Sequence, residues 1–355
     1  MRHALIGMIG LLVTISAAMD PPDPLQPVPK LAAPVVGAWN SSILVGTHHK
    51  TGTVLLAKVF RLAAKLMGVP RSKANKTSTG AACAELFESR SPGVCIEEHT
   101  SDRTLREWLA PGAPFIHVVR DPLEMCVSAY QYHLLGAEPW LLQPHHELGG
   151  KTLQQYYQDS SKAEGVVFEC KRLMNELVEE ALVFNATRGR RSTLTLYFED
   201  FARDYDGVMR RVFEYLDSRS QVGELLRLAS QYDLSKHSAG DERHVSAVDG
   251  KRPLREMLYA DPLLREILTG LRVLLGYSNE PAPKRALLCG SLRKLCATTR
   301  VGFFPWCPNG KVLFGRLPSL PQCGEAAVAK PWEGNRTKVA SQTPPVAPGG
   351  TLPKP

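Results

Sequence analysis

The sequence predicts an α/β fold in which a parallel central sheet is flanked by helices. Short apolar runs alternate along the chain with longer segments of helical period. Two of these runs, residues 43–45 and 115–119, end at a turn that leads directly into a helix. Strands that alternate with helices pair in parallel, and helices then cover both faces of the sheet. With 355 residues and 44% apolar content, the chain can form one large domain.

The net charge of +8 favours anionic ligands or partners. Nucleic acid is the general candidate for a basic protein, but the chain has no basic run of five or more residues and no basic patch interleaved with aromatic residues. We therefore expect no nucleic-acid partner.

The first strand–turn–helix unit occupies residues 43–67 and has the chemistry of an anion site. After the strand, a turn that contains Gly46, Lys50 and Gly52 enters the helix. Such a turn directs several backbone N–H groups and the positive end of the helix dipole at one point, and Lys50 adds a full positive charge there. We expect this loop to hold a phosphate with Lys50, Thr51, Gly52, Thr53 and Val54.

The spacing of the loop argues against a nucleoside triphosphatase or a nucleotide kinase. Their phosphate loop places its lysine directly after the second glycine, whereas Lys50 comes two residues before Gly52. A Gly-Lys-Thr does occur at residues 150–152, but His145 stands where the first glycine of that motif belongs. We interpret this occurrence as a helix entry.

The second unit places an arginine at the end of the strand over residues 115–119. Arg120 is followed by Asp121 as N-cap, a proline at the first helical position, and Glu124, which we expect to close a capping box. Ser128 lies two turns into the helix. The guanidinium of Arg120 offers a fork of donors that suits a phosphate better than the point charge of a lysine does.

These two units together resemble the donor-binding motifs of sulfotransferases, which use 3′-phosphoadenosine 5′-phosphosulfate (PAPS). Lys-Thr-Gly-Thr resembles their 5′-phosphosulfate loop, and Arg-Asp-Pro with a serine eight residues after the arginine resembles their 3′-phosphate motif. The resemblance covers roughly residues 40–277. It implies a P-loop NTPase-like sulfotransferase fold, PAPS as co-substrate without a metal, and Arg120 with Ser128 at the 3′-phosphate.

Two positions and one region depart from the pattern of the cytosolic family members. Phe198 stands where the family has a tyrosine that touches adenine, so it can stack but offers no hydroxyl. Leu55 replaces a tryptophan that stacks on adenine, which puts the chain nearer the Golgi and secretory carbohydrate sulfotransferases. Residues 231–252 correspond to a basic flap over the 3′-phosphate or form a solvated surface loop; Arg252 is our candidate there, with Arg243, His244 and Lys251 as further basic groups.

Sulfuryl transfer needs an anchored donor, stabilisation of charge on the leaving oxygen, and a base for the acceptor proton. Lys50 fits the second role. The family commonly takes its base from the end of the strand between the two motifs, where this chain has Glu97, Glu98 and His99. His99 lies 21 residues before Arg120, close to the spacing in cytosolic members. Carbohydrate sulfotransferases often use a glutamate, so Glu98 comes next and Glu97 stays open; His48 and His49 are candidates for donor or acceptor contacts.

The N-terminus indicates entry into the secretory route. Residues 4–18 are uncharged and mostly apolar and end in Ser-Ala-Ala, as expected of a cleavable signal peptide or, alternatively, a short type II signal anchor. We expect a Golgi-lumenal or secreted protein that meets the membrane only through such an anchor. Four N-x-[ST] acceptors agree with this expectation, at Asn40, Asn75, Asn185 and Asn335.

We expect five regions along the chain. These are a signal peptide or anchor at 1–18, a Pro-rich stem at 19–39, the sulfotransferase domain at 40–278, a Cys-containing extension at 279–340 and a disordered tail at 341–355. The cysteines are even in number, and in an oxidising compartment Cys289, Cys296, Cys307 and Cys323 should pair among themselves. We expect Cys83 and Cys95 to form a local bridge, and Cys126 and Cys170 to stay buried and reduced.

The resemblance implies a sulfotransferase that acts on a hydroxyl or amine, most simply on a glycan. The alternative is a catalytically inactive secreted binding protein on the same scaffold. The presence of Lys50, Arg120 and Ser128 argues against inactivity.

Overall fold

The computed structural model describes residues 38–74, 81–109, 112–136, 138–218, 220–233, 250–278, 290–292 and 294–295. The chain divides into two units, Met1–Lys30 and Leu31–Pro355, and all of these residues belong to the second. Within these ranges, no helix is long and apolar enough to cross a membrane. Several predicted features lie outside the described residues, namely the signal segment, nearly all of the stem, Asn75, Asn335, Arg243, His244, the four cysteines from Cys289 to Cys323, and the tail.

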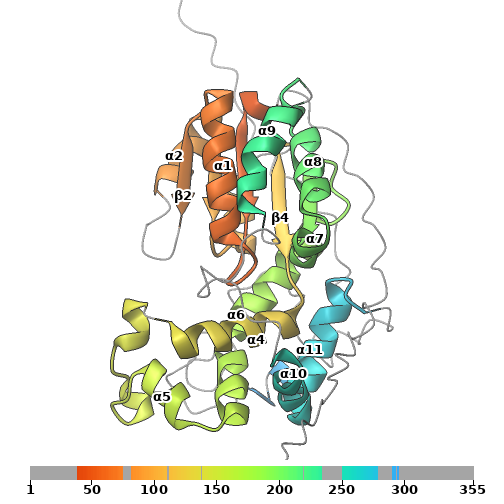
Figure 1. The fold of residues 1–355 in the computed structure, drawn as a ribbon. Coiled ribbons are helices and arrows are strands. Elements are labelled where there is room, and N and C mark those ends of the chain that lie inside the picture. Colours follow the sequence, from red (N-terminus) through yellow and green to blue (C-terminus); the bar gives the residue numbers. More distant parts are fainter. Residues whose placement is uncertain are drawn as a thin grey trace, which may run out of the picture. The chain divides into compact units, whose positions relative to one another are not determined.

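Five parallel strands form the central sheet (Figure 1), which confirms the predicted α/β class. The strands are β1 Ser42–Gly46, β2 Arg71–Ala74, β3 Gly93–Glu97, β4 Phe115–Val119 and β5 Thr193–Tyr197. Their order is β2-β3-β1-β4-β5, and every neighbouring pair is parallel. Because β1 lies between β3 and β4, the loops that follow these three strands leave the same edge of the sheet side by side.

Helices cover both faces of this sheet. Ile43 and Val45 of β1 pack with α1, α8 and α9, whereas Leu44 packs on the opposite side with residues of α2, α3 and α6. The strands are therefore buried on both faces, which explains why they read as continuous apolar runs. The helices are α1 Thr53–Met67, α2 Ala81–Glu88, α3 Asp102–Trp108, α4 Pro122–Leu135, α5 Leu153–Asp159, α6 Lys162–Thr187, α7 Phe198–Arg203, α8 Tyr205–Tyr215, α9 Val222–Ala229, α10 Lys251–Ala260 and α11 Pro262–Leu274.

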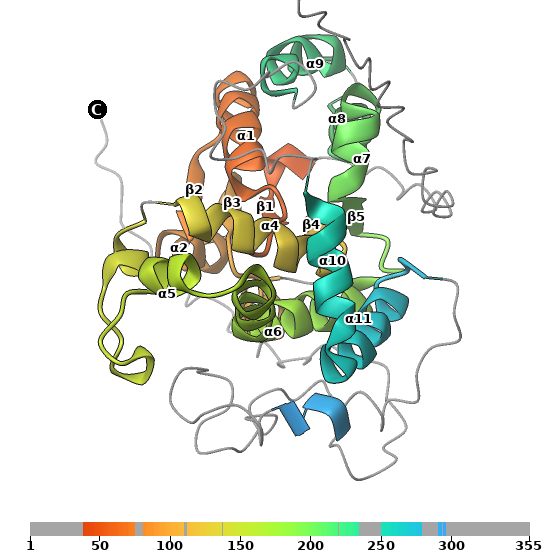
Figure 2. The ribbon, with the colours of Figure 1, turned by 60° about the horizontal axis from the view of Figure 1, so that its bottom comes forward.

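The helices α4, α5, α6, α10 and α11 pack against one another beyond the carboxyl ends of the strands. Figure 2 shows α10 beside α4 and α11, with α6 beneath α4. These helices share one apolar cluster with α5. The helix α6 therefore packs against several of the segments that carry site residues.

The described chain begins with a 3₁₀ turn, Ala38–Asn40, which spans the boundary that the sequence predicts between the stem and the domain. Ala38 and Trp39 are buried, and the Trp39 indole N–H donates to Ser218 Oγ at 2.6 Å. The side chain of Trp39 is thus part of the core of the domain.

The structure confirms one disulfide prediction and contradicts another. Cys83 and Cys95 are bonded, with their Cα atoms 5.5 Å apart. Cys126 and Cys170, which we expected to stay reduced, are also bonded. Cys126 lies on α4 and Cys170 on α6, and the packing of these helices brings the two Cα atoms to 4.7 Å, within the range that a disulfide spans. Burial was predicted correctly for both residues, but their proximity was not.

Candidate active site

The loop between β1 and α1 is held in shape by its own threonines. The hydroxyl of Thr51 accepts from the His48 N–H at 2.7 Å and donates to the His48 carbonyl at 2.9 Å. Thr47 Oγ1 and Thr53 Oγ1 are 2.8 Å apart, and Thr47 also donates to the Glu97 carbonyl. These contacts fasten the loop to the end of β3, so that it meets the first turn of α1 in a fixed conformation.

Two residues of this loop adopt a left-handed backbone. Gly52 has φ 94°, and a Cβ at that position would come within 3.0 Å of the Phe198 ring. Glycine is therefore required there both for conformation and for space. Lys50 has φ 65°, which costs energy for a residue with a side chain and persists only where its surroundings fix it. Val54, on the first turn of α1, is exposed.

The ammonium of Lys50 lies over an aromatic ring. Its Nζ is 3.7 Å from the centroid of Tyr132, a residue of α4, and the Tyr132 hydroxyl donates to Glu138 Oε1 at 2.8 Å. Burial lowers the pKa of Lys50 to about 8, and the nearby Arg120 contributes in the same direction. Lys50 is therefore mostly protonated at neutral pH, but much closer to losing its proton than an ordinary lysine.

Arg120 joins the two predicted phosphate motifs. Its Nη1 donates to the Lys50 carbonyl at 2.7 Å and to Ser128 Oγ at 3.3 Å. The guanidinium carbon lies 4.5 Å from the centroid of the Phe198 ring. The structure thus brings together four residues that the sequence suggested from three separate segments.

Two acids, one buried and one partly buried, hold the backbone beside Arg120. Glu180 of α6 accepts from the Arg120 N–H at 2.6 Å, and Glu199 accepts from the Asp121 N–H at 3.1 Å. Burial raises the pKa of Asp121 to about 6 and raises that of Glu180 well above its usual range. Arg272 of α11 donates to Asp121 Oδ2 at 3.0 Å and partly offsets this effect. The arginine therefore extends from a rigid support.

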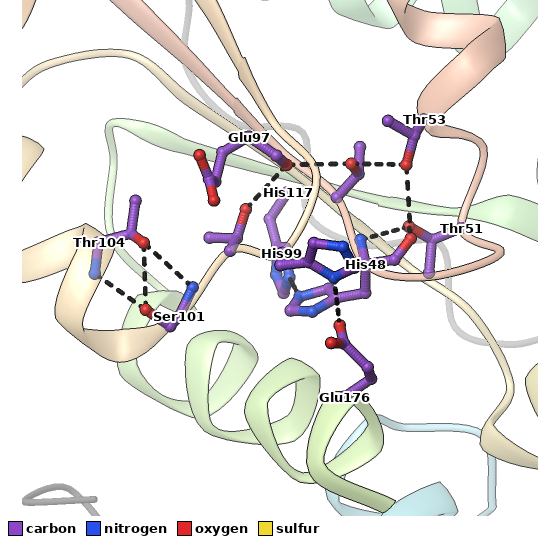
Figure 3. A network of polar contacts seen from close by, with 11 residues as sticks. His48, Thr51, Thr53, Glu97, His99, Ser101, Thr104, His117 and Glu176 are labelled. Carbon is purple, nitrogen blue, oxygen red and sulfur yellow. Dashed lines mark hydrogen bonds and ion pairs between the residues drawn. The ribbon is translucent and has the colours of Figure 1, made fainter. Parts of the chain in front are cut away.

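The end of β3 carries the three candidate bases. Glu97 is buried, and burial raises its pKa; Glu98 is only partly buried. His99 is also partly buried, and its Nδ1 lies 2.9 Å from Glu176 Oε2 of α6. Figure 3 shows the His99 ring beside that of His48 and above the Glu176 carboxylate. Glu176 is not among the site residues that the sequence predicts.

Two further histidines are buried beside these groups. His48 Nε2 and His117 Nε2 are 3.0 Å apart, so one ring donates and the other accepts. Burial lowers the pKa of His48 to about 4 and lowers that of His117 well below its usual range. Both rings are neutral at physiological pH. His49 stacks on His133, with ring centroids 5.1 Å apart.

The two basic residues that begin α10 differ in their surroundings. The side chain of Lys251 is 16% exposed and lies 3.8 Å from Glu124 Oε2, close enough to Arg120 for their charges to interact. The Arg252 side chain is 72% exposed and pairs with Glu256. Glu124 also accepts a hydrogen bond from Arg255. It does not close the expected capping box, because the N-cap contact of α4 is the one in which the Leu123 N–H donates to the Asp121 side chain.

At alkaline pH, the fall of kcat/KM for the donor should follow the loss of the proton from Lys50. Loss of the proton removes the positive charge, so kcat/KM for the donor should fall about tenfold per pH unit above roughly pH 8. Initial rates between pH 6 and 10 measure this fall. In kcat the same fall should lie at higher pH, since the anionic donor raises the pKa of the bound enzyme's lysine. A kcat/KM that stays flat to pH 10 would contradict the assignment.

Residues 40–246 match a protein-family model described as "Sulfotransferase domain". This match spans more than half of the chain and includes both predicted phosphate motifs. Among solved structures, the chain is similar to the mouse sulfotransferase SULT7A1 complexed with PAP, with 12% identity, a TM-score of 0.43, and coverage of 67% of this chain and 89% of that chain. No curated protein matches the chain.

Proposed function

This chain belongs to the sulfotransferase family, and from that premise we propose that it moves a sulfuryl group from PAPS to a carbohydrate acceptor in the secretory pathway. The observation that carries the proposal is the convergence at Arg120. Its guanidinium contacts both the Lys50 carbonyl and the Ser128 hydroxyl, which joins the two halves of one donor site.

In the proposed complex, the loop from Lys50 to Val54 holds the 5′-phosphosulfate. Arg120 and Ser128 hold the 3′-phosphate. We assign the stacking on adenine to the ring of Phe198, whose centroid lies 4.5 Å from the Arg120 guanidinium carbon. The sulfur–oxygen bond to the 5′-phosphate breaks as a bond from sulfur to the acceptor oxygen or nitrogen forms. Lys50 stabilises the negative charge that grows on the bridging oxygen, and adenosine 3′,5′-bisphosphate leaves.

We propose that His99 is the base that takes the proton from the acceptor. A neutral imidazole accepts a proton readily near pH 7, and the side chain of His99 is partly accessible. The side chain of Glu97 is buried, and the backbone carbonyl of Glu97 accepts a hydrogen bond from Thr47 of the Lys50 loop. Glu98 stays the second candidate. Replacing His99 with alanine should therefore lower kcat far more than replacing Glu98 with glutamine.

The surroundings of Lys50 suit an acceptor that carries many hydroxyls. Tyr132 and Trp140 are partly buried aromatic rings, and Glu138 accepts a hydrogen bond from each of them. Ring faces beside a carboxylate offer apolar contact and hydrogen bonding at the same place. We propose a glycan as the acceptor on this basis, together with the departure at Leu55.

A panel of acceptors tests this function. The purified protein is given labelled PAPS with glycans, proteins, and small phenols or amines in parallel. We expect label on a glycan. Label on phenols or amines alone would refute the carbohydrate acceptor, and a protein that binds the bisphosphate but labels nothing would be the inactive binding protein.

Lys251, instead of Arg252, is our candidate for the basic group that completes the 3′-phosphate site. Its shielded ammonium lies near Arg120, whereas Arg252 faces solvent. Lys251→Ala should raise the KM for PAPS about tenfold or more with little change in kcat, and Arg252→Ala should change the KM less than about twofold. A larger effect of Arg252→Ala would restore the sequence-based choice.

We further propose that the domain is lumenal. The apolar N-terminal segment and the four sequons support this placement, and so do the two disulfides, because such bonds persist in oxidising compartments. Asn40 is exposed and available to a glycan. Endoglycosidase treatment of the protein from secretory cells should increase its gel mobility. A protein without glycans and with all thiols free would refute the proposal.

A further inference from the structure

The helix α6 presents a carboxylate to the candidate base. Glu176 lies on the buried side of α6, and its Oε2 is 2.9 Å from His99 Nδ1. The side chain of Glu176 is 9% exposed and that of His99 is 19% exposed. In Figure 3 the carboxylate reaches the imidazole from below, on the side of α6. The ring is thus held from within the protein while part of it stays accessible.

This contact determines which ring nitrogen carries the proton. An ionised carboxylate only accepts hydrogen bonds, so Nδ1 must donate and Nε2 of the neutral ring keeps its lone pair. When Nε2 takes a proton, the ring becomes positively charged, and the adjacent carboxylate stabilises that charge. A carboxylate that orients a general base in this way fixes the tautomer without taking up the proton itself.

Another histidine with a carboxylate partner, also among the residues that the structure describes, differs in a decisive respect. His133 Nδ1 lies 3.0 Å from Glu169 Oε1, but both side chains are fully buried, and Arg172 donates to the same carboxylate. That pair can support the packing of α4 on α6 but cannot reach an acceptor. His99 and Glu176 combine the same contact with access from outside.

On the basis of the proposed role of His99, we infer that Glu176 is a positioning residue that holds His99 with its Nε2 free to accept the acceptor's proton. The proton passes from the acceptor hydroxyl or amine to Nε2 while the new bond to sulfur forms, and Glu176 stays ionised throughout. Glu176 contributes to turnover only through His99, and not to donor binding.

Glu176→Gln tests this inference. We expect kcat to fall about 10- to 100-fold, as is typical when a residue that supports a functional side chain is lost, with less than a twofold change in the KM for PAPS or in binding to immobilised adenosine 3′,5′-bisphosphate. Glu176→Asp keeps the charge and should retain more activity. Glu179→Gln is the control for a lost charge on the same helix: the charge of Glu179 interacts with that of Glu176 and, more weakly, with that of Arg106, so this variant changes the electrostatics around Glu176 but keeps the carboxylate that contacts His99; its kcat should stay within about twofold.

A double-mutant cycle separates positioning from an independent effect. In the His99→Ala background, Glu176→Gln should cause no further loss of kcat. The ¹⁵N NMR signals of His99 provide a second readout: the wild type should show the Nδ1-protonated tautomer, and Glu176→Gln should shift the ring towards a mixture. Retained bisphosphate binding establishes that the variant is folded; if Glu176→Gln does not fold, Glu176→Asp takes its place in both measurements.

Any of these results would overturn the inference: full kcat in Glu176→Gln, an equal loss in the His99→Ala background, or an unchanged tautomer. Full activity of His99→Ala would also overturn it, by removing the base. Failure of the proposed function is a different outcome, in which the wild type binds no bisphosphate or labels no acceptor. The NMR comparison still decides the role of Glu176 in that case.

Discussion

Replacing Lys50 with methionine is expected to lower kcat by two to three orders of magnitude, roughly the loss seen when a donor to a developing oxyanion is removed. Methionine keeps the length and the apolar stem but cannot neutralise the charge on the bridging oxygen. Bisphosphate binding should weaken much less, because Arg120, Ser128 and the loop N–H groups remain. Single-turnover rates with labelled PAPS and titration with adenosine 3′,5′-bisphosphate separate the two effects.

The same substitution should stabilise the protein. The folded-state pKa of Lys50, about 8, lies below its ordinary value of 10.5, so the unfolded chain binds this proton more tightly. Lys50 therefore opposes folding at neutral pH, and its unfavourable contribution disappears as the pH rises from about 8 to 10.5. Lys50→Met should raise the Tm at pH 7 and leave it nearly unchanged at pH 10.5. Transfer that survives the substitution, or a lower Tm at pH 7, would contradict the role given to Lys50.

Replacing Arg120 with alanine should weaken bisphosphate binding by about two orders of magnitude. The change removes the proposed fork to the 3′-phosphate and also frees the Lys50 carbonyl, which anchors a left-handed backbone. The KM for PAPS should rise, and kcat should fall as well because the loop loses its anchor. Isothermal titration and steady-state rates provide the two measurements.

Arg120→Lys is the matched variant, because it keeps the charge but not the planar fork. We expect it to recover only part of the affinity. Ser128→Ala removes one hydroxyl and should cost less than Arg120→Ala. If Arg120→Lys binds the bisphosphate as tightly as the wild type, charge alone is sufficient and the proposed fork is wrong.

The sequence was sufficient for the fold class because its signals are local. Apolar runs such as residues 43–45 and the helix starts at Gly52 and Asp121 depend on neighbouring residues alone, and the structure has strands and helices at these places. The two predicted phosphate motifs are recognisable in the sequence for the same reason, since each occupies one strand end and the turn that follows it.

The supporting residues could not be predicted, because their partners are distant in the sequence. Glu176 lies 77 residues from His99, and Glu180 lies 60 residues from Arg120. One indication was available: both are charged residues on the apolar side of α6, where an acid without a partner would be costly. The Cys126–Cys170 bond was missed for the same reason, since only the packing of α4 on α6 brings the two residues together.

One binding measurement tests most directly whether Arg120 and the Lys50 loop hold the two ends of a single donor. Adenosine 3′,5′-bisphosphate and adenosine 5′-monophosphate differ only in the 3′-phosphate, and each is titrated into the wild type and into Arg120→Ala. We predict that the wild type prefers the bisphosphate about 100-fold and that Arg120→Ala loses nearly all of this preference, while its affinity for the monophosphate falls far less, through the lost anchor of the Lys50 loop alone. Equal affinities of the wild type for the two ligands, or a preference that survives in Arg120→Ala, would contradict the assignment.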